Sequence, residues 1–70
     1  IEVAGDHTKS AYKTVQRISG VKAAYTVSGN YDLIVQVEAE NMEQLSDLLL
    51  SKIRAVDGVT KTNTFIVLNV

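Results

Sequence analysis

The chain has 70 residues, of which 46% are hydrophobic and 21% are charged, and its formal net charge is -1. This composition is typical of one compact domain and excludes a disordered chain. The sequence has no cysteine and one histidine, which excludes a disulfide framework and leaves no histidine pair at metal-ligand spacing. A domain this small buries only about 60% of its unfolded surface, so we expect association with another copy to add stability.

Lysine and arginine are scattered along the chain, without the concentrated positive patch that phosphate binding requires. We therefore expect no direct contact with nucleic acid. No apolar run approaches the roughly 20 residues that cross a bilayer, and residues 1–4 lack the features of a signal peptide. The sequence predicts a cytoplasmic protein with no membrane partner. Because the first residue is Ile1, there is room for further residues or another domain upstream.

The first half of the chain predicts a strand, a helix and a second strand. Residues 1–4 alternate apolar and polar side chains, and we expect Asp6 to cap a helix that runs to about Ser19. Gly20 then ends the helix, because glycine tolerates the left-handed backbone found at helix ends. The apolar residues of the helix recur at spacings of three and four and form one buried stripe: Ala11, Val15 and Ile18, with Tyr12 beside them.

Two β-rich runs, residues 21–28 and 31–39, flank Gly29 and Asn30, and this pattern predicts a tight hairpin. A Gly-Asn pair suits the primed turns, whose twist matches that of the flanking strands. A loop of those two residues fixes the register of the strands. The expected cross-strand pairs are Ser28 with Tyr31, Val27 with Asp32, Thr26 with Leu33, and Tyr25 with Ile34.

The second half of the chain predicts another helix and a closing strand. Asn41 and Gln44 form a capping arrangement that opens a helix through about Ala55. Gly58 ends this segment, and residues 60–70, rich in Thr, Phe, Ile, Val and Leu, predict the final strand. The buried stripe expected for the helix is Met42, Leu45, Leu48, Leu49 and Ile53.

An internal echo indicates that the chain consists of two similar halves. Residues 18–21 and 56–59 share the pattern of an apolar residue followed two positions later by Gly-Val, and each leads from a helix into a strand. Two strand-helix-strand units with right-handed crossovers interleave into one sheet. The sequence thus predicts the α+β class: a ferredoxin-like αβ-sandwich of order βαββαβ, with a four-stranded antiparallel sheet and two helices on one face. We expect residues 1–70 to form this single domain.

The face of the sheet turned away from the helices is also expected to be apolar. The predicted register directs Leu33, Val35 and Val37 toward the helices. The final strand is apolar on both sides, with Phe65 and Val67 on one and Ile66 and Leu68 on the other. Such a face predicts a symmetric homodimer that forms through the sheet. The expected interface residues are Tyr25, Val27, Ile34 and Gln36.

No set of residues stands out as a catalytic or cofactor site. His7 lies near a helix start beside Asp6, which favours a solvated or capping role. Asp32 and Glu38 lie six positions apart on one predicted strand, and a catalytic carboxylate pair there is the less favoured interpretation. We predict no enzymatic activity, no metal and no cofactor.

Residues 28–32 are the best candidate for ligand recognition, although a plain turn explains their composition equally well. Asp32 falls on the expected dimer face, where a carboxylate is costly without a partner. A ligand ammonium group would be such a partner, and the backbone amides around Gly29 could take a ligand carboxylate. Thr62 and Thr64 add hydroxyls, although threonine is also simply a good strand former. The predicted ligand-binding residues are Ser28, Gly29, Asn30, Tyr31, Asp32, Thr62 and Thr64.

Residues 20–33, GVKAAYTVSGNYDL, closely resemble the central stretch of the Lrp/AsnC ligand-binding (RAM) domain of transcription regulators. Residues 53–59 and 62–68 resemble the last helix, the Gly-Val turn and the closing strand of that family. The resemblance spans nearly the whole chain, with the opening strand a few residues short. It implies dimers with facing sheets, assembly into larger octamer-type rings, and amino acids or related metabolites bound between dimers. The ligand site implied lies near the family's Gly-x-Tyr-Asp turn, here Gly29, Tyr31 and Asp32, with Thr62 and Thr64 as weaker matches.

We therefore predict an effector-binding and oligomerisation module of a transcription regulator, in which an amino acid binds between subunits and shifts the assembly. The family's helix-turn-helix is not in this chain, which leaves a stand-alone module, a fragment, or a subunit that modulates full-length Lrp/AsnC relatives. One alternative is an ACT-like amino-acid sensor domain of a metabolic enzyme. Others are a small dimeric ferredoxin-like oxygenase or isomerase with catalytic His7 or Asp32, and a module whose whole function is assembly.

Overall fold

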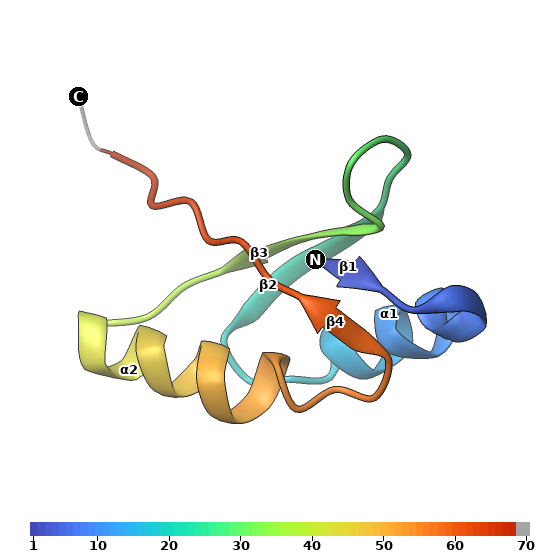
Figure 1. Cartoon of the computed structure of the whole chain (residues 1–70). Helices are drawn as coiled ribbons and strands as arrows, with labels where there is room; N and C mark the ends of the chain where they lie inside the picture. The colour runs from blue at the N-terminus through green and yellow to red at the C-terminus, as the bar shows by residue number, and fades with distance from the viewer. Residues whose placement is uncertain (69–70) are drawn as a thin grey trace.

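The computed structural model describes residues 1–68, in which both helices lie on one side of the strands (Figure 1). In chain order the elements are β1 (Glu2–Val3), a 3-10 turn (Gly5–His7), α1 (Thr8–Gln16), β2 (Val21–Thr26), β3 (Leu33–Val37), α2 (Met42–Asp47), a π-helical stretch (Leu48–Ile53) that continues α2, and β4 (Val59–Lys61). The predicted order of strand, helix, strand, strand, helix, strand is confirmed. None of the helices in residues 1–68 is long and apolar enough to cross a bilayer.

Helix α1 buries the apolar stripe expected from its spacing, and Ala11 and Val15 are its buried residues. The predicted cap at Asp6 is wrong. The amide of His7 donates to the carbonyl of Ala4 at 3.0 Å, which closes a 3-10 turn before the α-helix begins. Asp6 therefore lies inside that turn, and His7 takes the cap position without a side-chain hydrogen bond to the helix.

The two Gly-Val segments fold into the same turn, as the internal echo predicts. In residues 18–21 and again in residues 56–59, the amide of the last residue donates to the carbonyl of the first at 3.1 Å. Gly20 and Gly58 adopt φ values of 99° and 93°, a region that other residues enter at a cost. The same local chemistry therefore leads each helix back to the sheet.

Strands β2 and β3 pair in the predicted register. Tyr25 lies opposite Ile34 and Thr26 opposite Leu33. The tight turn is wrong, because regular pairing stops at Thr26 and Leu33 and leaves residues 27–32 as a loop. Of the two primed turns, type I′ is excluded because it needs positive φ at both central residues, and in this loop only Gly29 has it, at 113°.

The four expected strands form two antiparallel pairs, and the backbone hydrogen bonds of Ile1 join one pair to the other. Strand β1 pairs with β4, and β2 pairs with β3. The amino group of Ile1 donates to the carbonyl of Leu33 at 2.9 Å, and the amide of Leu33 donates to the carbonyl of Ile1 at 3.1 Å. Two residues that exchange both backbone bonds are antiparallel neighbours. The strand order is therefore β4-β1-β3-β2.

The long closing strand over residues 60–70 is the largest error of the sequence prediction. Strand β4 ends at Lys61, and none of the backbone hydrogen bonds outside helices and strands involves residues 62–68. Strand β1 is only two residues long, so a longer β4 has no neighbour to pair with on that side. In Figure 1 the chain after β4 runs away from the body of the fold. Residues 69–70 of the predicted strand lie outside the described residues.

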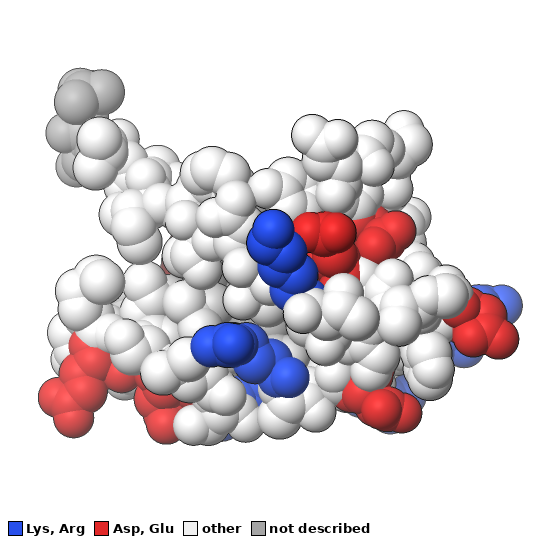
Figure 2. All heavy atoms as spheres, viewed as in Figure 1, with Lys and Arg blue, Asp and Glu red and all other residues white. Residues whose placement is uncertain are grey.

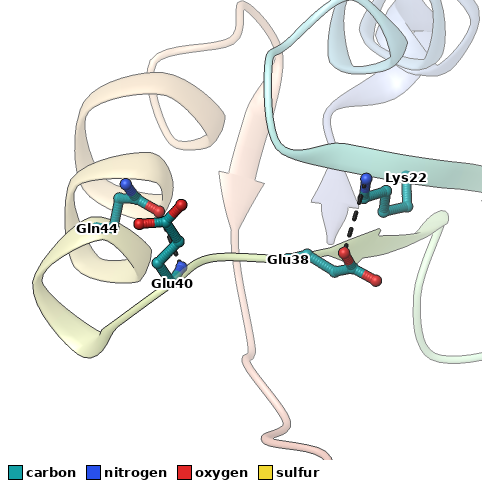
Figure 3. A network of polar contacts seen from close by, with 4 residues as sticks. All are labelled: Lys22, Glu38, Glu40 and Gln44. Atoms are coloured by element: carbon teal, nitrogen blue, oxygen red, sulfur yellow. Dashed lines mark hydrogen bonds and ion pairs between the residues drawn. The ribbon is translucent and has the colours of Figure 1, made fainter.

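The core lies between the helices and the strands. Its central cluster is Val3, Ala11, Val15, Ala24, Leu33 and Val56. Helix α2 has the predicted cap, since the Asn41 side chain accepts from the amide of Gln44 at 2.8 Å, while Gln44 accepts from the amide of Glu40 at 2.9 Å (Figure 3). The stripe of α2 is wrong at Met42, which is 64% exposed because it begins the helix, beyond the buried positions of Leu48 and Ile53.

Candidate functional site

The loop of residues 27–32 projects from the end of the β2–β3 hairpin (Figure 1). Its tip, made of Ser28, Gly29 and Asn30, is exposed. A Cβ atom placed on Gly29 would meet no atom within 4 Å, so the backbone there faces open space. A ligand could approach the peptide groups of this loop without displacing any side chain.

Asp32 fastens the base of this loop to β1 and to Ile1, which precedes β1. Its Oδ2 atom accepts from the amide of Val3 at 2.8 Å, and its backbone amide donates to the carbonyl of Ile1 at 2.9 Å. Its carbonyl accepts from the amide of Val27 at 3.0 Å. The carboxylate of Asp32 was expected to need a partner. One partner is a peptide N–H of the chain itself. The other oxygen, Oδ1, accepts no hydrogen bond from residues 1–68.

The amino group of Ile1 lies beside this carboxylate. Burial lowers the pKa of the Ile1 amino group, and the nearby charges of Glu2 and Asp32 oppose that shift. The amino group keeps its hydrogen bond to the carbonyl of Leu33.

Tyr31 connects the loop to the segment after β4. Its hydroxyl accepts a hydrogen bond from the side-chain amide of Asn63 at 2.8 Å. Sequence reasoning singled out Thr62 and Thr64 and missed Asn63, which lies between them. The available signal was a polar amide in a run that otherwise favours a strand, but its partner lies 32 positions away.

Tyr31, Thr62 and Thr64 line one cavity of about 290 Å³. The cavity lies between β3 and the segment after β4, and Leu49 and Ile53 also line it. None of the side chains of residues 1–68 that line it is charged. The other predicted ligand residues, Ser28, Gly29, Asn30 and Asp32, do not line this cavity. The fold therefore divides the seven predicted residues between the cavity and the projecting loop.

The predicted dimer-interface residues all lie exposed on the side of the strands opposite the helices. Tyr25 is 55% exposed and Ile34, its cross-strand partner, is 46% exposed. Val27 and Gln36 are exposed as well. Residues 65–68 form no strand and all four are exposed, although Phe65 and Val67 line the cavity and Ile66 and Leu68 do not. In Figure 2 the tip of the projecting loop and the segment after β4 are white, while charged side chains lie below them, in the middle of this face and around the helices.

The side chains considered for catalysis do not come together. Glu38 lies 3.6 Å from the ammonium group of Lys22 (Figure 3), whereas Asp32 bonds to Val3 at the other end of β3. His7 packs against Gly58. Within residues 1–68 no three His, Cys, Asp or Glu side chains are grouped so that they could hold a metal ion.

The sequence and the fold both match known proteins. The chain is 35% identical over 60 residues to the HTH-type transcriptional regulator LrpA1 of Halobacterium salinarum, a match that covers 86% of this chain and 42% of that protein. It is 39% identical over 62 residues to homocitrate synthase of Sulfolobus acidocaldarius, covering 89% of this chain and 13% of that enzyme. The structure of E. coli AsnC matches with a TM-score of 0.92 at 27% identity, over 99% of this chain and 47% of AsnC.

This chain spans less than half the length of each of these relatives. The matches to LrpA1 and AsnC agree with the ferredoxin-like α+β arrangement seen here. The family model for the Lrp/AsnC ligand binding domain matches residues 1–70, the whole of the chain. The chain therefore belongs to the Lrp/AsnC ligand-binding domain family.

Proposed function

We propose that this chain is the effector-binding and assembly module of an Lrp/AsnC-type transcription regulator. An amino acid or a related small metabolite binds at residues 28–32, at a contact between subunits, and changes the state of assembly. The observation that carries this proposal is a loop held firmly at its base and open at its tip. Asp32 ties the base to β1 through Val3 and closes the loop through Val27, while the backbone at Gly29 faces open space.

The chemistry of the loop suits a zwitterionic ligand. The Oδ1 atom of Asp32 is available to the ammonium group of an amino acid, because only Oδ2 bonds to Val3. The open amides around Gly29 can donate to the carboxylate of the ligand. Ser28, Asn30 and Tyr31 then flank the ligand, and the hydroxyls of Thr62 and Thr64 would approach from the segment after β4.

Assembly follows from the exposed apolar side of the strands. We propose that Tyr25, Val27, Ile34 and Gln36 pack against the same residues of a second copy in a homodimer, and that dimers associate into an octamer-type ring. Full-length Lrp/AsnC relatives are further partners that would use the same contact. A bound effector shifts such an equilibrium only through its different affinity for the two assembly states.

The test pairs two substitutions of Asp32. Asp32→Asn keeps an oxygen that can accept from Val3 but removes the charge, so it should lower the free energy of unfolding by about 1 kcal/mol or less, the difference between a charged and a neutral hydrogen bond. It should also weaken amino-acid binding by about 10-fold or more, since hydrogen bonds to charged groups are worth about 1.5–3 kcal/mol. Asp32→Ala should weaken binding and also lower the free energy of unfolding by about 1–3 kcal/mol, because it leaves the Val3 amide without its acceptor.

Calorimetry with a panel of amino acids measures the affinity, urea unfolding measures stability, and native mass spectrometry measures assembly with and without ligand. Unchanged affinity in Asp32→Asn would remove Asp32 from the ligand site. A panel in which no amino acid binds the parent chain or changes its mass distribution would overturn the proposed function itself.

A second function is favoured by the match to homocitrate synthase. In that case this chain is the amino-acid sensor segment of a metabolic enzyme, which is the role of the ACT-like alternative. The loop site would then regulate an attached catalytic domain. The two functions can be distinguished by the domain that is encoded in the same polypeptide as residues 1–70. A helix-turn-helix domain supports the regulator, and a catalytic domain supports the enzyme.

A further inference from the structure

Residues 28–31 of the loop and residues 62–68 after β4 lie outside every helix and strand and are joined by a side-chain hydrogen bond. Within residues 1–68, none of the backbone hydrogen bonds outside helices and strands involves either stretch. The contact that joins them runs from the side-chain amide of Asn63 to the hydroxyl of Tyr31, at 2.8 Å. Both stretches lie on the side of the strands away from the helices (Figure 1). The position of one stretch relative to the other therefore depends on this contact.

Tyr31 joins the anchored base of the loop to its open tip. Asp32, the next residue, is held by hydrogen bonds of 2.8 Å from Val3 and 2.9 Å to Ile1, whereas residues 28–30 are exposed. The Tyr31 side chain is half-buried, and its hydroxyl is bonded to Asn63. The contact thus restrains the loop one residue nearer to its tip than Asp32 does.

Asn63 lies between Thr62 and Thr64, the residues of this segment that are proposed to contact the effector. Neighbouring Cα atoms are only about 3.8 Å apart, so a contact that fixes Asn63 also limits the distance of both threonines from the loop. All three residues line the same cavity as Tyr31. The apolar side chains of residues 65–68 follow directly and are exposed. The hydrogen bond therefore lies between the effector loop and an apolar surface that a second copy could contact.

We infer that Asn63 is a positioning residue of the effector site and that its hydrogen bond to Tyr31 couples the loop to residues 62–68. The inference rests on the proposed function, and it names the route by which a bound effector changes assembly. An effector held by the loop and by Thr62 and Thr64 orders both stretches. Because the hydrogen bond joins them, ordering one stretch favours ordering the other. The apolar side chains of residues 65–68 then take a defined position for contact with another copy.

The size of the coupling is limited by the strength of one exposed hydrogen bond. A neutral hydrogen bond of this kind changes an equilibrium constant by about 2- to 10-fold. Loss of the contact should therefore weaken effector binding without abolishing it. The direction of donation is not essential, because a tyrosine hydroxyl can donate as well as accept. A carboxylate in place of the Asn63 amide would accept from Tyr31, which provides a rescue variant.

The experiment removes each partner of the hydrogen bond and then restores the bond. Asn63→Leu removes the donor with a side chain of similar shape, Tyr31→Phe removes the acceptor, and Asn63→Asp accepts from the Tyr31 hydroxyl. Thr60→Val is the matched control, because it removes an exposed hydrogen bond of 3.1 Å to the carbonyl of Glu2 that does not involve the loop. The ligands are the standard L-amino acids. Calorimetry measures their affinity, and NMR measures the chemical-shift changes that they induce at residues 65–68.

Asn63→Leu and Tyr31→Phe should each weaken the tightest-binding amino acid by at least about 2-fold, and Asn63→Leu by no more than about 10-fold. The double variant should lose no more than the weaker-binding single variant, because both substitutions act on one bond. The ligand-induced shift changes at residues 65–68 should disappear in both single variants and return in Asn63→Asp. Thr60→Val should behave like the parent chain. NMR cross-peaks between the Asn63 side-chain amide and the Tyr31 ring should be present in the parent chain without ligand.

Three results overturn the inference and leave effector binding itself intact. They are additive losses in the double variant, shift changes at residues 65–68 that persist in Asn63→Leu, and shift changes that Asn63→Asp does not restore. Absence of the cross-peaks between Asn63 and Tyr31 overturns it as well. If no amino acid binds the parent chain, the proposed function fails, and the inference fails with it.

Discussion

The β2–β3 hairpin and the segment after β4 have similar composition, but only the hairpin forms paired strands. Both are rich in residues that favour strands. The hairpin pairs over five positions, whereas residues 62–68 make no strand. The hairpin brings its own partner, because its two strands are joined by one short loop. The later segment depends on β1, which is two residues long. Strand propensity is therefore realised only where a neighbouring edge is available.

The two regions differ most in the exposed fraction of two apolar residues, Leu33 in β3 and Val67 after β4. Leu33 is 0% exposed and Val67 is 95% exposed. Leu33→Ala should lower the free energy of unfolding by about 2–5 kcal/mol, the range for truncating a buried leucine. Val67→Ala should change it by less than about 0.5 kcal/mol. Urea unfolding of both variants at low micromolar concentration, where self-association contributes least, makes the comparison.

A large effect of Val67→Ala at that concentration would break the contrast, since it would mean that the terminal segment packs against the fold in solution. A concentration-dependent effect would have a different meaning. It would assign Val67 to a contact between copies and leave the account of the single chain intact.

The same comparison can be made for two glycines with positive φ, one at an end of each strand pair. Gly58, just before β4, has φ of 93°, and a Cβ atom there would lie 2.4 Å from the Cβ of His7. Gly29, at the hairpin tip, has φ of 113° and open space around it. Gly58→Ala should destabilise by about 2–4 kcal/mol, from backbone strain and overpacking together. Gly29→Ala should cost about 1–2 kcal/mol, from strain alone.

Thermal and urea unfolding of the two alanine variants would measure this difference. Equal losses would mean that His7 moves aside without cost, so that the contact between the 3-10 turn and the start of β4 contributes nothing to stability. The Gly29 variant is the matched control, because it carries the same backbone penalty without a clash.

The parts of the fold that were predicted correctly depend on short spacings. The hairpin register was predicted from the position of Gly29 and Asn30 and is correct although the two-residue turn does not form, and the α2 cap follows from Asn41 and Gln44, three positions apart. Met42 was placed wrongly because its spacing fits the stripe, while the sheet does not reach that end of the helix. The long final strand was wrong because the length of its neighbour is a property of the whole sheet.

The candidate site was also predicted only where it depends on neighbouring residues in the sequence. The loop was located from a local Gly-x-Tyr-Asp pattern and from the family resemblance. The contact of Asp32 with the amide of Val3 spans 29 positions, and that of Tyr31 with Asn63 spans 32. The first of these uses a backbone group, which carries no signal in the sequence. Site geometry that depends on such long-range contacts could be found only in the folded chain.

The smallest expected effect tests what sets the hairpin register. Lys22 is the extra residue at a β-bulge, between the pairs Val21–Val37 and Ala23–Gln36, and its ammonium group lies 3.6 Å from Glu38 (Figure 3). Both side chains are more than half exposed, at 55% and 67%. Exposed ion pairs contribute about 0–1 kcal/mol and are screened by salt.

Lys22→Ala should therefore change the free energy of unfolding by less than about 0.5 kcal/mol, and raising the salt concentration should remove even that difference. The bulge should persist, because the amide of Glu38 still donates to the carbonyl of Gly20 at 2.9 Å. NMR cross-peaks between Tyr25 and Ile34 report the register directly. A shifted register in this variant would mean that the ion pair aligns the strands. An unchanged register assigns that role to the buried face of β3, where Leu33 would be moved to the solvent side by a slip of one residue.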